Sequence, residues 1–298
     1  MMRKSVIAIV TASALALGVT ALGASAQKFA VKPHAEVDLM SGFAYDASMQ
    51  LNAKSSSNEF GADFGYTFLE SLGNRLEVNV GLGYRYLNVR LNAGDFGYDY
   101  AAPAAADEDG NAYTRFCEVS GLHQKASTGY VTLPVYLQYG YRATSWLEVQ
   151  ALVGLKFGFA TGASLNTTSG TVDSYGIFPE YDDLLIDQPY IDDFGEVILK
   201  GRDGVKPRTA GFGCWAMVGA GLSARVYGPV WLDLGIRYNI GFTNVFGKGV
   251  KSADGYTAAT APVTYTVADG TRVRPLTDYL TKSVLSPLTL NVGLTLRF

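Results

Sequence analysis

The final eleven residues of the chain alternate without interruption between apolar side chains and small or polar ones. Every second position from Leu288 to Phe298 is apolar, and threonine, asparagine, glycine and arginine stand between them. A period of two residues is that of a β-strand, whose successive side chains point to opposite faces. Seven further segments repeat this pattern. The sequence therefore predicts a closed membrane barrel that is apolar toward lipid and polar toward its lumen.

We expect an all-β, eight-stranded antiparallel up-and-down transmembrane barrel. The predicted strands cover approximately residues 34–46, 59–69, 76–86, 131–141, 147–159, 212–226, 230–242 and 288–298. Extended loops, the longest at 92–127, 160–210 and 247–283, follow the odd-numbered strands, and short turns follow the even-numbered ones. Outer-membrane barrels have short periplasmic turns and long extracellular loops. This alternation predicts that both termini lie in the periplasm.

The first residues have the pattern of an export signal. Arg3 and Lys4 precede an apolar run that ends in Ala24-Ser25-Ala26 before Gln27, which is typical of a secretory signal with a small-residue cleavage site. Residues 1–26 are therefore predicted to be removed, which leaves 27–298 as a single barrel domain. A retained membrane anchor is the alternative, and we rank it second.

Composition excludes several classes of function. Without Arg3 and Lys4 the chain has 22 basic residues against 27 acidic ones, so nothing suggests nucleic acid as a partner. After the signal, no apolar stretch approaches the roughly 18–20 residues of a spanning helix. A membrane protein without such helices must close its strands into a barrel to satisfy its backbone hydrogen bonds in lipid.

Two local features predict irregular pairing. Past Tyr86 the apolar set changes parity to Leu87, Val89 and Leu91, which indicates either a bulge or a strand end rising above the membrane. Pro134 lies inside a predicted strand, where it removes one ladder hydrogen bond.

The strand Thr132-Leu-Pro-Val-Tyr-Leu-Gln-Tyr139 and the ending Leu-Thr-Leu-Arg-Phe298 carry a resemblance to a known family. The chain resembles the outer-membrane β-barrel domain family of Gram-negative bacteria, especially small barrels of the Bacteroidota, and more distantly OmpA- and OmpX-type barrels. The resemblance implies that the barrel-assembly machinery reads the terminal strand. The corresponding residues are Leu290, Val292, Leu294, Leu296 and Phe298.

The lumen of an eight-stranded barrel is only wide enough to be filled by its own side chains. The predicted lumen charges are Glu36, Asp38, Glu59, Asp63, Glu77, Arg85, Glu148, Lys156, Arg225, Asp233, Arg237 and Arg297. Buried charges are costly unless they pair, so we interpret them as an ion-pair network that plugs the barrel. A conducting path is the alternative.

The sequence offers little for catalysis. His34 begins the first predicted strand, where we expect an interfacial residue, and His123 lies in a predicted outer loop. The two histidines are therefore expected on opposite sides of the membrane. No His/Ser constellation like that of the barrel enzymes accompanies them.

Both cysteines are predicted near the outer side of the membrane. Cys117 lies in the second outer loop and Cys214 near the outer end of the sixth strand. An exported compartment permits disulfides, so a bridge between them is one hypothesis. The other is that Cys214 is a small lipid-facing residue.

Acidic loop segments raise the question of metal binding. Asp107-Glu-Asp109-Gly-Asn111 followed by Glu118 imitates calcium-loop spacing, but Ala112 stands where the turn glycine belongs and no helices flank it. The acidic third loop is a candidate for divalent cations that bridge lipopolysaccharide. Simple solvation is the favoured interpretation of both loops, and no metal site is predicted.

Together these features predict a non-enzymatic outer-membrane barrel with a structural or surface-interaction role through its outer loops. A small transport or secretion-associated pore is the alternative, and an outer-membrane enzyme ranks last. The expected partners are outer-membrane lipid and lipopolysaccharide, the assembly machinery, and an extracellular partner that the sequence does not name. No cofactor is expected.

Overall fold

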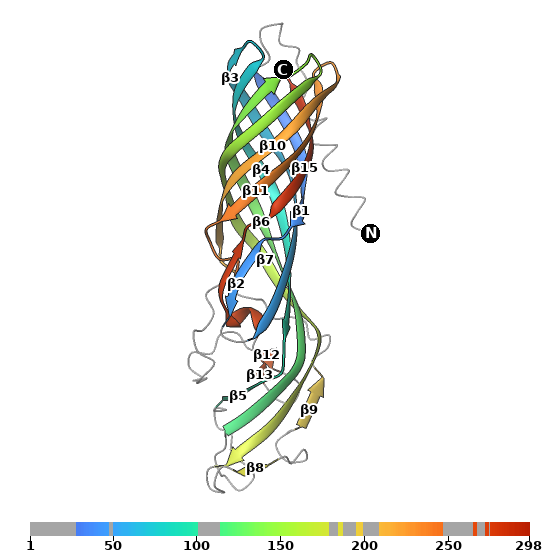
Figure 1. Cartoon of the computed structure of the whole chain (residues 1–298). Helices are drawn as coiled ribbons and strands as arrows, with labels where there is room; N and C mark the ends of the chain where they lie inside the picture. The colour runs from blue at the N-terminus through green and yellow to red at the C-terminus, as the bar shows by residue number, and fades with distance from the viewer. Residues whose placement is uncertain are drawn as a thin grey trace.

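Eight strands form a closed antiparallel barrel in the computed structural model (Figure 1), which describes residues 28–47, 50–100, 114–178, 184–186, 195–198, 209–246, 265–266, 272–273 and 275–298. The barrel strands are β1 (Phe29–Met40), β3 (Leu51–Ser71), β4 (Asn74–Ala93), β6 (Thr114–Arg142), β7 (Leu147–Phe178), β10 (Phe212–Tyr227), β11 (Val230–Gly241) and β15 (Leu288–Arg297). Each pairs antiparallel with the next, and β15 pairs with β1 to close the ring. The predicted eight-stranded up-and-down fold is confirmed.

The closing seam brings the two ends of the barrel sequence together. Val37 lies opposite Leu290, and Ala35 opposite Val292. At the end of the seam the Phe298 amide donates to the Phe29 carbonyl at 2.8 Å. Both ends of the barrel sequence therefore lie beside the short turns, which include Leu72-Gly73 and Gly228-Pro229.

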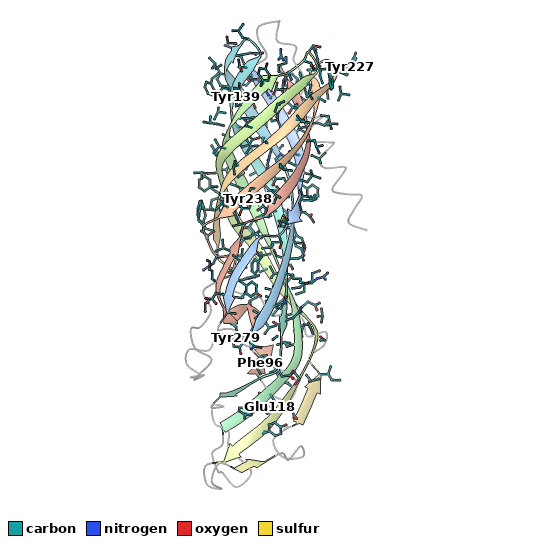
Figure 2. The ribbon with its side chains drawn as sticks, viewed as in Figure 1. Phe96, Glu118, Tyr139, Tyr227, Tyr238 and Tyr279 are labelled. Atoms are coloured by element: carbon teal, nitrogen blue, oxygen red, sulfur yellow. The ribbon has the colours of Figure 1, made fainter. Side chains whose placement is uncertain are left out.

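The outer surface of the barrel is apolar, as the alternation predicts. Leu82, Val153 and Leu234 are 62%, 60% and 51% exposed, and Tyr139 and Tyr227 project outward at the short-turn end (Figure 2). Side chains of the opposite parity point inward and are mostly polar. None of the described helices is long and apolar enough to cross a membrane.

Four strands continue well beyond the closed ring at the end opposite the short turns (Figure 1). β6 has 29 residues and β7 has 32. We call the part formed by residues 51–57, 87–93, 114–129 and 160–178 the extension. Short strands β5 (Phe96–Tyr100), β8 (Leu184–Ile186) and β9 (Gly195–Ile198) pair along its tip.

The predicted loops 92–127 and 160–210 are thus wrong over much of their length, because these residues extend β6 and β7. Their alternation is harder to recognise because the outward residues are polar and the β6–β7 register shifts between Ser120 and Gln124. Gly121 has a positive φ of 56° at that shift, a backbone conformation that glycine adopts without strain.

The inner face of the extension packs against a small second layer. This layer consists of β2 (Phe43–Ala47), β14 (Leu280–Leu285) and the 3-10 helix η2 (Leu276–Tyr279). Their shared core contains Leu87, Val89, Leu91, Ala93, Cys117, Val119, Leu122, Ala126, Leu165, Val172, Val245, Phe246, Leu276, Tyr279, Leu280 and Leu285. We call this group the apolar cap. Phe96 packs on it, with its ring centroid 5.8 Å from that of Tyr279 (Figure 2).

Of the two alternatives predicted for the change of parity after Tyr86, the bulge is wrong, and the strand instead continues beyond the ring to Ala93. The pairings of β4 with β3 and β6 keep their register from Tyr86 to Leu91. Leu87, Val89 and Leu91 point inward, on the same face as the lumen residue Arg85, and are almost fully buried. The parity changes because the interior becomes apolar beyond the ring, while the strand itself continues.

Three smaller features complete the fold. The first strand starts at Phe29 instead of 34, and the chain turns at Gly42, where φ is 53° and a β-carbon would overlap the Ser286 carbonyl. The irregularity expected at Pro134 is confirmed as a gap in the β4–β6 ladder. The two pairs between Val80–Val135 and Gly83–Thr132 are missing, and the register is the same on both sides of the gap. β12 (Tyr265–Thr266) and β13 (Arg272–Val273) form a separate pair.

Candidate functional site

The middle of the barrel interior holds a cluster of five charged side chains from five strands. Lys156 Nζ lies 3.1 Å from a Glu36 carboxylate oxygen and 2.9 Å from one of Glu59. Arg85 contacts the same two carboxylates at 3.4 and 2.8 Å, and Arg237 donates to Glu36 at 2.6 Å. All five side chains are buried. Opposite charges therefore compensate the loss of water around each of them.

A second cluster lies nearer the short turns. Arg75 donates to Glu77 and to Glu148, both at 2.6 Å. Arg297 donates to Glu148 at 3.0 Å, and Lys32 pairs with Glu77. Seven of the predicted lumen residues, in addition to Glu59, form ion pairs in these two clusters. These are Glu36, Glu77, Arg85, Glu148, Lys156, Arg237 and Arg297.

The other predicted lumen residues have different partners. Asp63 accepts a hydrogen bond from Tyr136 at 2.7 Å, and His34 lies 3.4 Å from it. Asp233 bonds to the hydroxyls of Ser223 and Thr295. Asp38 bonds to the Ser57 hydroxyl at 2.7 Å. Hydroxyl groups thus donate to these carboxylates in place of lysine or arginine, and Asp63 Oδ1 has no hydrogen-bond partner.

Three assignments from the sequence need correction. Arg225 is exposed at a short turn, where it donates to the Gly228 carbonyl at 2.8 Å. It is therefore not part of the lumen network. His34 is buried in the barrel and is not interfacial. His123 lies in β6 of the extension, exposed, with Nδ1 2.6 Å from the Asn92 amide oxygen, and not in a loop.

Sequence reasoning missed Lys32 and Arg75 as members of the network. Both were placed outside the predicted strands, although each continues the polar parity of its strand by one step beyond His34 and Glu77. Extending the alternation to the start of each strand would have found them.

Glycines make room for the charged side chains. A β-carbon at Gly81 would overlap the Asp63 carboxylate and lie 2.9 Å from the Pro134 ring, and one at Gly140 would lie 2.5 Å from a Glu148 oxygen. A narrow barrel holds this many charged groups only because small residues face them from the next strand.

Aromatic side chains fill most of the remaining interior. Arg297 lies 4.1 Å from the Trp231 ring centroid, Arg237 5.5 Å from that of Tyr136, and Arg85 5.6 Å from that of Trp215. A small cavity of about 30 Å³ remains beside His34, Asp63 and Tyr136. One water needs roughly 10–15 Å³, so this cavity has room for about two.

The apolar cap covers the end of the network that lies away from the short turns. Trp215 is almost fully buried and donates through its indole nitrogen to the Leu285 carbonyl of β14 at 3.0 Å. Tyr130 packs edge-on against it at 5.9 Å and donates to the Val245 carbonyl at 3.3 Å. These two aromatic residues join the charged lumen to the apolar cap.

Of the two hypotheses for the cysteines, the Cys117–Cys214 bridge is wrong, since no disulfide joins these residues. Cys214 pairs opposite Phe157 of β7, whereas Cys117 pairs opposite Ser174 of the same strand. At about 3.3 Å per residue, on the order of 50 Å separates these positions along β7. Cys117 is also buried inside the apolar cap, and Cys214 belongs to the outward parity of the barrel.

Within the described ranges, no group of three or more His, Cys, Asp or Glu side chains is arranged to hold a metal ion. The calcium-like segment 107–111 and most of the acidic third loop lie outside the described residues.

A closed barrel with an apolar outer surface and a charged interior defines a membrane β-barrel protein. Residues 15–247 match the family model described as outer membrane protein beta-barrel domain, and the chain belongs to this family. It is therefore a β-barrel protein of the bacterial outer membrane.

Three solved structures show remote similarity to the chain. Ail, the attachment invasion locus protein of Yersinia pestis, is 10% identical with a TM-score of 0.28, and the match covers 91% of this chain and 99% of that one. The translocator domain of the autotransporter NalP from Neisseria meningitidis is 10% identical, with a TM-score of 0.25 and coverage of 99% and 95%. The transport unit of AIDA-I from Escherichia coli is 10% identical, with a TM-score of 0.27 and coverage of 97% on both sides. No curated protein matches the chain.

Proposed function

We propose that this protein is a non-conducting, non-enzymatic barrel that anchors the extension in the outer membrane and presents it to a partner outside the cell. One observation carries the proposal. The lumen is occupied along its length by two ion-pair clusters and aromatic residues, and the apolar cap covers the end away from the short turns. An ion that entered would have to separate buried charge pairs and then cross an apolar core, and both steps are costly.

The proposal includes an orientation. The short turns and both ends of the barrel sequence face the periplasm, residues 1–26 are removed on export, and the extension stands outside. Support comes from the asymmetry of outer-membrane barrels, whose periplasmic connections are short, and from the signal-like residues before Gln27.

Assembly is proposed to begin from the terminal strand. Leu290, Val292, Leu294 and Leu296 lie on the outward face of β15, and Phe298 follows directly after the strand and is exposed. Replacing Phe298 with aspartate should reduce the folded fraction in outer membranes. Replacing Phe29 with aspartate, an exposed aromatic residue on the adjacent β1, is the matched control. Equal losses in the two variants would argue against a specific role of the terminal residue.

Conductance tests the closed lumen. The protein is purified from outer membranes, its folding is verified by the mobility difference between unheated and boiled samples on a gel, and it is inserted into planar bilayers. The expected result is a heat-modifiable protein without stepwise current. Steady single-channel conductance would overturn the closed barrel and favour the pore.

Surface labelling tests the orientation. A peptide epitope inserted directly after Tyr100, where β5 ends in the extension, should bind antibody on intact cells. The same epitope inserted after Gly228 should be detected only after the outer membrane is permeabilised. The reverse pattern would contradict the proposed orientation and would have no bearing on the closed lumen.

A further inference from the structure

Three cations form a row across the outer face of the extension. Lys54 of β3 pairs directly opposite Arg90 of β4, and Arg90 pairs directly opposite Lys125 of β6. All three side chains are exposed. Side chains directly opposite each other on adjacent antiparallel strands are about 4.5–5.5 Å apart at their β-carbons. The extension therefore concentrates three positive charges on one small area of its surface.

No acidic side chain in the described part of the chain neutralises the row. Among the described residues, none of the three cations forms an ion pair, whereas each cation of the two lumen clusters does. Its neighbours on the same face are hydrogen-bonding residues that include no lysine, arginine or carboxylate, namely Asn52, Ser56, Asn88, Asn92, His123, Ser127 and Asn166. Like charges placed directly opposite destabilise a sheet, and the whole chain carries a net charge of −3. The row therefore costs stability in a protein that is not generally basic.

The row also lines a surface hollow, and its position along the barrel axis is fixed relative to the exposed tyrosines of β4. A surface hollow of about 470 Å³ is bounded by Lys54, Arg90, Lys125 and neighbouring serine and asparagine residues. Tyr84 and Tyr86 lie exposed on the same face of β4, and exposed aromatic residues mark the interface of a membrane. Arg90 lies four residues beyond Tyr86, which for a strand tilted by about 40° is roughly 10 Å farther along the barrel axis.

We propose that Lys54, Arg90 and Lys125 bind the phosphate groups on the sugar head group of lipopolysaccharide in the outer leaflet. An arginine flanked by two lysines matches phosphate, because guanidinium bonds two phosphate oxygens at once and ammonium groups add point charges. The surrounding serines and asparagines supply partners for sugar hydroxyls. The choice of a lipid phosphate rests on the proposed orientation, which puts the row just above the outer leaflet.

The test compares two triple variants of the full-length folded protein in detergent. In the first, Lys54, Arg90 and Lys125 are each replaced by glutamine. In the matched control, three exposed cations away from the row, Arg142, Arg225 and Lys282, are replaced in the same way. Unheated gel mobility verifies that both variants fold. Binding of phosphorylated lipid A, lipid A without its phosphates, and inorganic phosphate is then measured by titration calorimetry at low and high salt.

Each cation near an anionic surface contributes about fivefold to binding, so loss of the row should weaken phosphorylated lipid A binding on the order of 100-fold at low salt. The control variant should bind like the natural protein, and high salt should reduce the difference. The proposal would be overturned if both triple variants bound phosphorylated lipid A equally well. It would also be overturned if the natural protein bound lipid A without phosphates as tightly as phosphorylated lipid A. Inorganic phosphate binding as tightly as the lipid would overturn the assignment to a lipid. None of these binding results depends on the conductance measurement, so the phosphate site and the closed lumen can each be overturned separately.

Discussion

The barrel and the extension use the same strands but have opposite interiors. Along β4 the inward residues are Arg75, Glu77 and Arg85 within the barrel, and Leu87, Val89 and Leu91 within the extension. The outward residues change in the opposite sense, from Leu82 and Tyr84 to Asn88 and Arg90. One strand of constant register thus carries both a membrane pattern and a soluble pattern.

The difference shows that the solvent outside a sheet determines what its inside contains. Where lipid surrounds the barrel, the outward face must be apolar, and polar residues are confined to the lumen and must satisfy one another. Where water surrounds the extension, the outward face is polar and burial of aliphatic side chains stabilises the structure. Four experiments test this contrast between the barrel and the extension.

The largest effect is expected in the barrel, from Glu36→Gln. Arg237 would lose its carboxylate partner, and Lys156 and Arg85 would share Glu59 alone. Removing one member of a buried ion pair costs about 3–5 kcal/mol. Urea unfolding in lipid vesicles, followed by tryptophan fluorescence, measures this loss. Glu118→Gln, an exposed glutamate of the extension, is the control, and an equal response would show that the network does not stabilise the barrel.

The next effect is expected in the extension, from Leu91→Ala. Leu91 is fully buried in the apolar cap, and removing a buried leucine side chain costs about 2–5 kcal/mol. Limited proteolysis should cut the extension faster, while the barrel keeps its heat-modifiable mobility. Leu82→Ala on the same strand faces lipid and should not change the cleavage rate of the extension. Equal cleavage in both variants would contradict an independently packed cap.

A smaller effect is expected from Gly81→Ala. The new methyl group would push against Asp63 and the Pro134 ring, and such overpacking costs about 1–3 kcal/mol. The same urea experiment measures it. Gly162→Ala is the control, because a β-carbon there meets nothing within 4 Å. Unchanged stability of Gly81→Ala would mean that the lumen has more free space than its packing indicates.

The smallest effect is expected from the pair Arg142–Glu70 at the short-turn end. Their side chains are 41% and 36% exposed and lie 3.4 Å apart. Exposed pairs contribute about 0.2–1 kcal/mol. A double-mutant cycle with Arg142→Gln and Glu70→Gln should give a coupling in that range that vanishes in high salt. The cycle for Arg75 and Glu148 should give a larger coupling free energy that resists salt. Similar coupling free energies for the two pairs would contradict the expected difference between lumen and surface ion pairs.

The barrel was predictable because its pattern has one cause. Lipid requires the outward face of every strand to be apolar, so alternation alone identified eight strands and most of the network, including Glu36 and Lys156. The extension was not predictable in the same way. Its outward residues are polar like those of a loop, and the shift near Gly121 interrupts the period. The partners of Asp63 and Asp233 also depend on cross-strand register, which alternation alone does not specify.

The unbroken length of β6 and β7 has a consequence for how the protein changes over evolutionary time. About ten residues of a strand cross the hydrocarbon layer, so most of these 29 and 32 residues lie beyond it. In the proposed orientation, with the short turns in the periplasm, the tip would stand on the order of 50 Å above the membrane. Antibodies and bacteriophages would meet the tip before any other part of the protein. Selection by them should diversify β5, β8 and β9 in natural populations, while the residues beneath, constrained by packing, remain nearly invariant.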